Sequence, residues 1–243
     1  MIDSLITCLI TTSPSIKHPD TAIIEGTVAS IRWHLPESEI LIACDGVRKE
    51  QENYRERYSE FVLRMENLCL TKWKNVRLIV QPEFLHQAQL IAKTVEQIKT
   101  PVLLFTEHDM ELLPITIDWE NAASLIQDGQ VNLIRFMLED GIKPEWQGFM
   151  LGPLDGFYVD VLKTVQWSQR THLASVAYYR KMLAEHVKPA DRCYLEDRFY
   201  GQCDDWEANK LTIYMPAILM ARIKHTDGRG NEPKFDSILE GKE

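Results

Sequence analysis

Short apolar runs alternate with longer amphipathic stretches through the first part of the chain. Each run is too short for a helix and apolar enough for a buried parallel strand; the runs occupy 4–11, 39–43, 76–80 and 101–106. Between them apolar residues recur every three or four positions, which predicts helices over 21–34, 50–70 and 82–98. The β-α-β-α-β-α-β order predicts an α/β fold, a parallel sheet with helices on both faces and right-handed crossovers.

The regular alternation stops after Asp109. A short helix is predicted at 119–127, with Asp118 as its cap and Gly129 just beyond its end. Glycine and proline recur from 139 to 160, which predicts loops and short antiparallel strands. Further strands are expected at 131–138, 161–168, 211–215 and 218–223, and further helices at 171–187 and 192–201. The second half therefore predicts a mixed extension of the parallel sheet.

Composition restricts the classes of partner and compartment. The chain has 243 residues and 27 basic against 36 acidic side chains, a net charge of −9, which disfavours binding to nucleic acid. Its five cysteines are odd in number and show no zinc-like pair spacing, so we expect a reducing, cytoplasmic setting. No run of eighteen apolar residues occurs, so no transmembrane segment is expected.

Polar side chains follow three of the predicted strands. Glu107, His108 and Asp109 come directly after the fourth strand, where ligands of open α/β sheets bind. Their carboxylates suit a hard cation, although a solvated charged loop has the same pattern. Asp45 follows the second strand, as an acceptor for a nucleotide's base or ribose or as part of an Asp-Gly turn. The hydroxyl-rich turn after the first strand, 12–15, fits a nucleotide or a plain turn.

Two further features come late in the chain. The acidic pair Glu196-Asp197 lies on a predicted helix, either as a pair that takes part in chemistry or as a solvated first turn favoured by the helix dipole. His225 stands in the stretch KHTDGRG, as a metal ligand or as an ordinary surface or core histidine. Each feature alone is weak evidence for a functional site. Their order along the chain is more specific.

In that order, the features resemble a family 2-type glycosyltransferase with the GT-A fold, over about Ser4 to Gly230. The resemblance implies one domain, 1–243, with a nucleotide-sugar-binding half at about 1–112, an acceptor-side half at about 113–230 and a tail at 231–243. The segment 164–175 also resembles a strand-to-helix segment of small bacterial members. Two departures stand out: Glu107 replaces the usual first Asp of the D-x-D-like motif, and HQAQLIAK at 86–93 replaces a glycine- and asparagine-rich helix.

The resemblance assigns roles to individual positions. It implies an Mn²⁺ or Mg²⁺ site made by Asp109, His225 and Glu107. It implies that the second acid, Asp197, is the catalytic base, with Glu196 as second candidate. The implied contacts to the nucleotide sugar are Thr11, Thr12, Ser13, Asp45, Glu107, His108 and Arg229. Aromatic and polar residues beyond the strand ends, namely Trp146, Gln169 and His172, are expected to face the acceptor.

Three functions remain open on the sequence. The leading interpretation is a metal-dependent transfer of sugar from a nucleoside diphosphate sugar to a saccharide or other hydroxyl acceptor, with inversion. The second is a sugar nucleotidyltransferase, although the loop TTSPSIK lacks the glycine-rich, basic character that this chemistry uses. The third is a non-catalytic nucleotide- or saccharide-binding protein built on a degenerate transferase fold.

Overall fold

The computed structural model describes residues 2–156, 160–215 and 221–226. Its first half contains four parallel strands in the order β3-β2-β1-β4. These strands are β1 (Ile6–Thr12), β2 (Glu39–Cys44), β3 (Val76–Val80) and β4 (Val102–Glu107). The helices between them are α1 (Ala22–His34), α2 (Arg55–Thr71) and α3 (His86–Val95), with 3-10 turns at η1 (Ile2–Ser4) and η2 (Lys49–Tyr54). The parallel half-sheet predicted from the sequence is confirmed.

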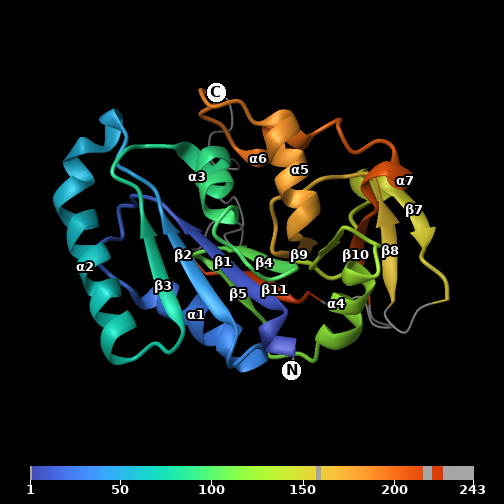
Figure 1. Ribbon diagram of the computed structural model, residues 1–243, viewed down its shortest axis with the longest axis horizontal. Helices are drawn as coiled ribbons and strands as arrows, with labels where there is room; N and C mark the ends of the chain where they lie inside the picture. The colour runs from blue at the N-terminus through green and yellow to red at the C-terminus, as the bar shows by residue number, and fades with distance from the viewer. Residues whose placement is uncertain (1, 157–159, 216–220, 227–243) are drawn as a thin grey trace, which may run out of the picture.

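The second half extends the same sheet with mixed strand directions. Beyond β4 the order continues β9-β6-β10-β8-β7, and β9 runs antiparallel to both β4 and β6. These strands are β6 (Leu133–Arg135), β7 (Met150–Pro153), β8 (Val161–Thr164), β9 (His172–Ser175) and β10 (Leu211–Tyr214). The remaining helices are α4 (Trp119–Gln127), η3 (Pro144–Phe149), α5 (Val176–His186), α6 (Leu195–Phe199) and α7 (Trp206–Asn209). The sheet therefore passes through both halves of the chain (Figure 1).

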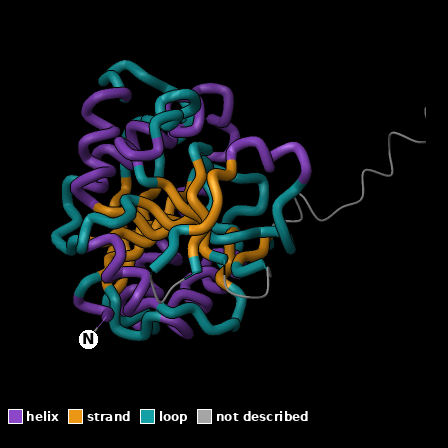
Figure 2. The backbone as a smooth tube through the Cα atoms, turned by 90° about the vertical axis from the view of Figure 1, so that its right-hand side faces the viewer, coloured by secondary structure: helices purple, strands orange, loops and turns teal. Residues whose placement is uncertain are grey.

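Two layers of helices enclose the sheet, because its strands bury both faces. In β1, Cys8 and Ile10 pack with α1, α2 and α4, whereas Leu9 packs with α3, α5 and α6 on the opposite face. The same alternation holds in β4, where Leu104 and Phe105 face opposite layers. Figure 2 shows the strands between the two groups of helices. A sheet covered on both faces requires continuously apolar strands, which is the pattern the sequence has.

A small second sheet lies against α1. β5 (Met110–Leu112) follows β4 after a tight turn and pairs antiparallel with β11 (Ile223–His225). In this pairing His225 lies opposite Met110, next to Asp109. The pairing joins residues more than one hundred positions apart, and so brings the predicted metal-binding residues of the two halves together.

Several predicted boundaries are wrong. The helix expected at 171–187 begins only at Val176, because the four residues before it form β9, the central strand that joins β4 to β6. Ser175 then caps the helix by accepting a hydrogen bond from Tyr178 N. The helix expected from Pro82 begins at His86, and the one expected at 192–201 covers only 195–199. Strands expected at 131–138 and 161–168 are shorter, and the one expected at 218–223 falls partly outside the described residues, with β11 starting at 223.

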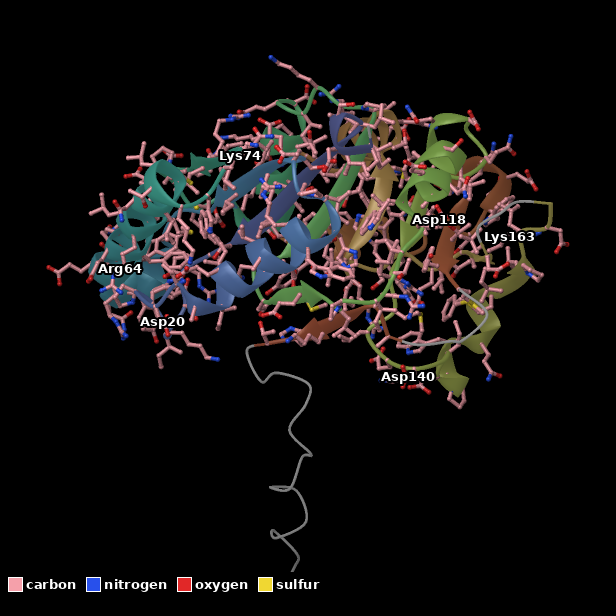
Figure 3. The ribbon with its side chains drawn as sticks, turned by 90° about the horizontal axis from the view of Figure 1, so that it is seen from below. Asp20, Arg64, Lys74, Asp118, Asp140 and Lys163 are labelled. Atoms are coloured by element: carbon pink, nitrogen blue, oxygen red, sulfur yellow. The ribbon has the colours of Figure 1, made fainter. Side chains whose placement is uncertain are left out.

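Charged side chains cover the outside of the molecule. Figure 3 places Asp20 and Arg64 at the end formed by α1 and α2, and Asp118 and Lys163 toward the other end. Asp118 accepts a hydrogen bond from Asn121 N and so caps α4, as predicted. Exposed ion pairs such as Arg64–Glu60 add little stability each. In the described parts of the chain, no helix is both long and apolar enough to cross a membrane.

Candidate active site

A cavity of about 350 Å³ opens where β1, β2 and β4 end. We call it the strand-end cavity. Its lining comes from the three strand ends, the start of α3, and two later segments that reach over it: Thr11, Thr12, Ser13, Asp45, Arg48, Gln51, Phe84, His86, Gln87, Leu90, Glu107, His108, Asp109, Tyr194 and His225. All the predicted nucleotide-contacting residues except Arg229 thus lie around one space. Arg229 lies outside the described residues.

Backbone hydrogen bonds hold the strand ends together beyond the regular sheet. Asp45 N donates to Thr12 O at 2.9 Å, and His108 N donates to Thr11 O at 3.0 Å. A side chain at position 46 would overlap the backbone of Glu83, which explains the glycine there. Thr12 is 3% exposed, and its hydroxyl has no hydrogen-bond partner among the described residues. It is therefore a buried polar group of the strand-end cavity that has no hydrogen-bond partner among the described residues.

Asp45 is the anchor of α3. Its carboxylate accepts hydrogen bonds from the backbone N–H groups of Gly46 at 2.8 Å, Leu85 at 2.8 Å and His86 at 2.9 Å. Burial raises the pKa of this carboxyl, and the three N–H donors act in the opposite direction. A carboxylate offers roughly four acceptor positions, so about one remains for a ligand. Asp45 was expected as a nucleotide acceptor or as part of an Asp-Gly turn; its bond from Gly46 N agrees with the turn, and its contact with a nucleotide stays a prediction.

Glu107 and Asp109 differ in their surroundings. Gln87 Nε2 donates to Glu107 Oε1 at 2.6 Å, and Gln87 Oε1 accepts from Leu195 N at 3.3 Å, so one side chain links the end of β4 to the start of α6. Asp109 is 1% exposed, and its Oδ2 lies 3.8 Å from His225 Nε2. Among the described residues no group of three or more His, Cys, Asp or Glu side chains gathers as a metal site. Among the described residues, the Asp109 carboxylate and the His225 imidazole are the two groups that approach each other within 4 Å at this position.

A second cavity, of about 610 Å³, lies beside the first and shares Gln87, Glu107 and Tyr194 with it. We call it the loop cavity, because the loops after β6 and β8 form most of it. Its other lining residues are Met110, Arg135, Met137, Glu139, Gly141, Ile142, Lys143, Trp146, Met150, Gln166, Trp167, Ser168, Gln169, Arg170, Glu196 and Tyr200. The two cavities together form one continuous lining over the carboxyl ends of the strands.

The acidic pair of α6 divides between two positions. Glu196 lines the loop cavity, and its Oε1 accepts a hydrogen bond from Gln169 N at 2.6 Å. Asp197 lines neither cavity, and its Oδ2 accepts from Tyr194 N at 3.2 Å within a capping box. Adjacent positions on a helix point about 100° apart, so only one of the two faces the cavity. The expected order, Asp197 before Glu196, is thus the reverse of the order in which they approach the site.

The expected acceptor residues also divide. Trp146 and Gln169 line the loop cavity. His172 does not: it is fully buried in β9, with Nδ1 at 2.6 Å from Arg170 O and Nε2 at 2.9 Å from Tyr179 Oη. Burial, followed by the nearby Arg135 charge, lowers its pKa to about 4 against the pull of the Arg170 carbonyl, so it is neutral. The structure therefore corrects the prediction that His172 faces an acceptor.

Arg135 is a lining residue that the sequence analysis missed. It stands in the run VNLIRFML, where it is the one charged residue among mostly apolar ones, and that was the available signal. Gln87 and Tyr194, shared by the two cavities, were also missed. Nothing in their sequence neighbourhood marks them, because their role depends on the start of α3 contacting the segment that leads into α6.

No protein-family model and no curated protein matches the sequence. Solved structures match the fold. TarS 1–349 from S. aureus has a TM-score of 0.57 at 12% identity, over 92% of this chain and 60% of that one. GalNAc-T7 with UDP, GalNAc and Mn²⁺ has a TM-score of 0.57 at 13% identity, over 98% of this chain and 46% of that one. TarS 1–349 in complex with UDP-GlcNAc gives 0.55 at 12% identity, over 96% and 60%.

These similar structures are GT-A glycosyltransferases, and this chain has the GT-A fold. The sheet order and the mixed second half agree with the fold expected from the sequence. The chain spans about half to three fifths of the length of these chains. Identity this low establishes the fold, and activity has to be argued from the two cavities.

Proposed function

We propose that this chain transfers a sugar from a nucleoside diphosphate sugar to a hydroxyl acceptor with the help of a divalent cation. The observation that carries the proposal is the pair of adjoining cavities, one holding Asp109 and His225 and the other holding Glu196. Donor and acceptor need neighbouring spaces, because the reacting carbon lies between them. Structures with the same fold that are described with UDP, UDP-GlcNAc and Mn²⁺ support this division of the site.

The residues at the strand ends fit a divalent cation. Asp109 supplies a buried carboxylate and His225 an imidazole nitrogen 3.8 Å from it. Carboxylates suit Mg²⁺ and Mn²⁺, and the two protein ligands leave positions for phosphate oxygens and water. When bound, the cation supplies positive charge at the departing diphosphate. In this proposal Glu107, which accepts a hydrogen bond from Gln87, contacts the ribose or a water molecule bound to the cation.

Glu196 is the base in this proposal. The bond from Gln169 N fixes one oxygen of its carboxylate, and the other is left for the acceptor hydroxyl. As the acceptor oxygen bonds to the anomeric carbon, its proton passes to Glu196 and the bond to the diphosphate breaks, so the electron pair leaves with the phosphate. Direct displacement of this kind inverts the anomeric configuration. Asp197, engaged by the Tyr194 backbone, holds the start of α6 in place.

The cation part of the proposal is tested by binding. UDP and GDP are titrated by calorimetry into the wild type and into Asp109→Asn, each with Mn²⁺, with Mg²⁺ and with EDTA. We expect metal-dependent nucleotide binding in the wild type and its loss in the variant. Glu111→Gln is the matched control, because Glu111 is two residues away, pairs with Lys224 at 2.8 Å and lines neither cavity. Equal metal-dependent affinity in Asp109→Asn would contradict the assignment.

The base is tested by turnover. Donor hydrolysis and transfer are followed for Glu196→Gln and Asp197→Asn with whichever nucleotide sugar the binding screen identifies. Glu196→Gln is expected to keep donor binding and to lower the rate about 10²–10⁴-fold, the usual contribution of a positioned base. Asp197→Asn is expected to lower it far less. The opposite result would restore the order implied by the sequence, and binding without any turnover would favour a non-catalytic nucleotide-binding protein.

A further inference from the structure

Arg135 lies at the floor of the loop cavity as a buried cation, and no counter-ion for it occurs in the described part of the chain. It is 7% exposed, and among the described residues no carboxylate lies within 4.0 Å of its guanidinium. Its nearest polar partner is the neutral Gln166 Oε1, at 3.3 and 3.4 Å from Nη1 and Nη2. Its Nε has no partner within the described residues. A buried charge is costly unless it is paired, so this arrangement is incomplete as it stands.

The neighbouring charged side chains do not provide Arg135 with a counter-ion. Arg170 is held by both oxygens of Glu139, at 2.6 and 3.1 Å, and Lys143 binds the same carboxylate at 3.1 Å. Glu196 attracts Arg135 from beyond ion-pair distance while Arg170 repels it. Burial, with this repulsion, lowers the Arg135 pKa to about 10, so the guanidinium is still charged at neutral pH. The lining of the cavity thus has three cations, Arg135, Lys143 and Arg170, and three acids, Glu107, Glu139 and Glu196, and none of these acids lies within ion-pair distance of Arg135.

A second donor without a partner lines the same cavity. The indole Nε1 of Trp167 is buried and has no hydrogen-bond partner among the described residues, and the residue is 4% exposed. Both groups donate hydrogen bonds and neither accepts them. A carboxylate or phosphate offers several acceptor oxygens, and arginine binds either group in a bidentate manner. Trp146, which is 39% exposed, adds an aromatic face on which a sugar ring can pack.

From these observations we infer that the loop cavity binds a saccharide that carries an anionic group, carboxylate or phosphate, and that Arg135 is the residue that binds this group. That this ligand is the acceptor of the transfer rests on the proposed function. The anion site itself does not depend on that function. Arg135 lines the loop cavity and does not line the strand-end cavity, so the diphosphate of a donor is not its partner. Gln166, now its neutral neighbour, holds the side chain in position until the ligand binds.

The test uses three probes that share a sugar ring: glucuronate, glucose 6-phosphate and glucose. Each is titrated, without nucleotide or metal, into the full chain, and tryptophan fluorescence and calorimetry report binding. We expect at least one anionic sugar to bind about ten- to a hundredfold more tightly than glucose, the usual effect of a charge-assisted pair. The better of the two identifies the group as carboxylate or phosphate. Equal affinity for all three sugars would overturn the inference.

Variants locate the site. Arg135→Gln is expected to remove the preference for the anionic sugar, and Arg135→Lys to keep part of it because the charge remains without the planar fork. Arg77→Gln is the matched control, since Arg77 is exposed on β3, beside Glu39 and Gln97 and far along the sheet. If Arg135→Gln is unfolded at the titration temperature, the test rests on Arg135→Lys. An affinity of Arg135→Lys for the anionic sugar equal to that of the wild type overturns the inference. A preference that persists in a folded Arg135→Gln overturns it as well.

The result of the sugar-binding test can be separated from the result of the test of the proposed function. Metal-dependent nucleotide binding is measured with Asp109→Asn, whereas sugar binding is measured in its absence with the Arg135 variants. A protein that binds an anionic sugar but no nucleotide would refute the transfer reaction and leave the anion site. A protein that binds nucleotide and metal but shows no preference among the three sugars would do the reverse.

Discussion

Replacing Asp45 with asparagine perturbs a single carboxylate that holds the start of α3 on the end of β2. The asparagine side chain would keep one oxygen, which can still accept from Gly46 N and Leu85 N as Oδ1 does now. The amide group would occupy the place of Oδ2 and would face His86 N, so that two donors meet. The variant therefore loses one hydrogen bond, weakens two and leaves a backbone N–H without its partner.

The expected cost follows from those three bonds. A hydrogen bond to a charged group contributes about 1.5–3 kcal/mol, and a neutral one about 0.5–1.5 kcal/mol. One lost bond and two weakened bonds give about 3.5–6 kcal/mol. Burial raises the pKa of Asp45, so removing the charge relieves a desolvation cost and returns part of this loss. The net expectation is about 3 kcal/mol, which for a domain of this size lowers Tm by about 6–12 °C.

Urea unfolding, followed by circular dichroism, measures the free energy of unfolding of the wild type and of Asp45→Asn. Asp20→Asn is the control, because Asp20 lies at the exposed start of α1 (Figure 3), where its Oδ1 accepts one bond, from Ala22 N at 2.8 Å. That variant is expected to lose less than about 1 kcal/mol. A loss in Asp45→Asn no larger than in Asp20→Asn, with the same slope against urea, would refute the view that Asp45 anchors α3. A destabilised variant is also expected to bind nucleotide weakly, because His86 and Gln87 follow the anchor directly.

Two further predictions concern packing and pH. In a Tyr179→Phe background, His172→Phe is expected to reduce acid destabilisation between pH 7 and pH 4.5 by about 2–3 kcal/mol. The folded pKa of His172, about 4, lies below the unfolded value, so its contribution is present above pH 6.5 and is lost toward pH 4; equal losses in both proteins would contradict this. Gly46→Ala places a methyl group against the backbone of Glu83 and is expected to cost about 1–3 kcal/mol by urea unfolding. Gly148→Ala, which meets nothing, is its control.

The parallel half of the fold was predictable because local pattern and long-range pairing agree there. The runs that form β1, β2 and β4 are buried almost throughout, and each helix between two runs has one apolar stripe. The end of β4 was also predictable. Glu107 and Asp109 follow an apolar strand directly, and charged side chains at that point must face a ligand or solvent. The strand-end cavity follows from parallel strands ending together.

The second half was less predictable because its strands are short and are defined by their partners. The four residues of β9 continue into α5 without a break in the apolar pattern, and only pairing with β4 and β6 makes them a strand. The sequence equally could not rank Glu196 and Asp197, since the choice depends on how α6 is rotated against Gln169. His172 was expected to face the acceptor from the start of a predicted helix, whereas it lies in the central strand β9 and is fully buried.

The place of β9 in the sheet also has a consequence for synthesis on the ribosome. β9 is the only neighbour of β4 on the side away from β1 among the described strands, and it ends at residue 175 whereas β4 ends at 107. The 68 residues between these two positions (175 − 107) take about 3–14 s to translate at 5–20 residues per second. Throughout that interval one edge of the apolar strand β4 has no strand to pair with. A pause before residue 172, or a truncation there, thus leaves an open strand edge to which other chains can add.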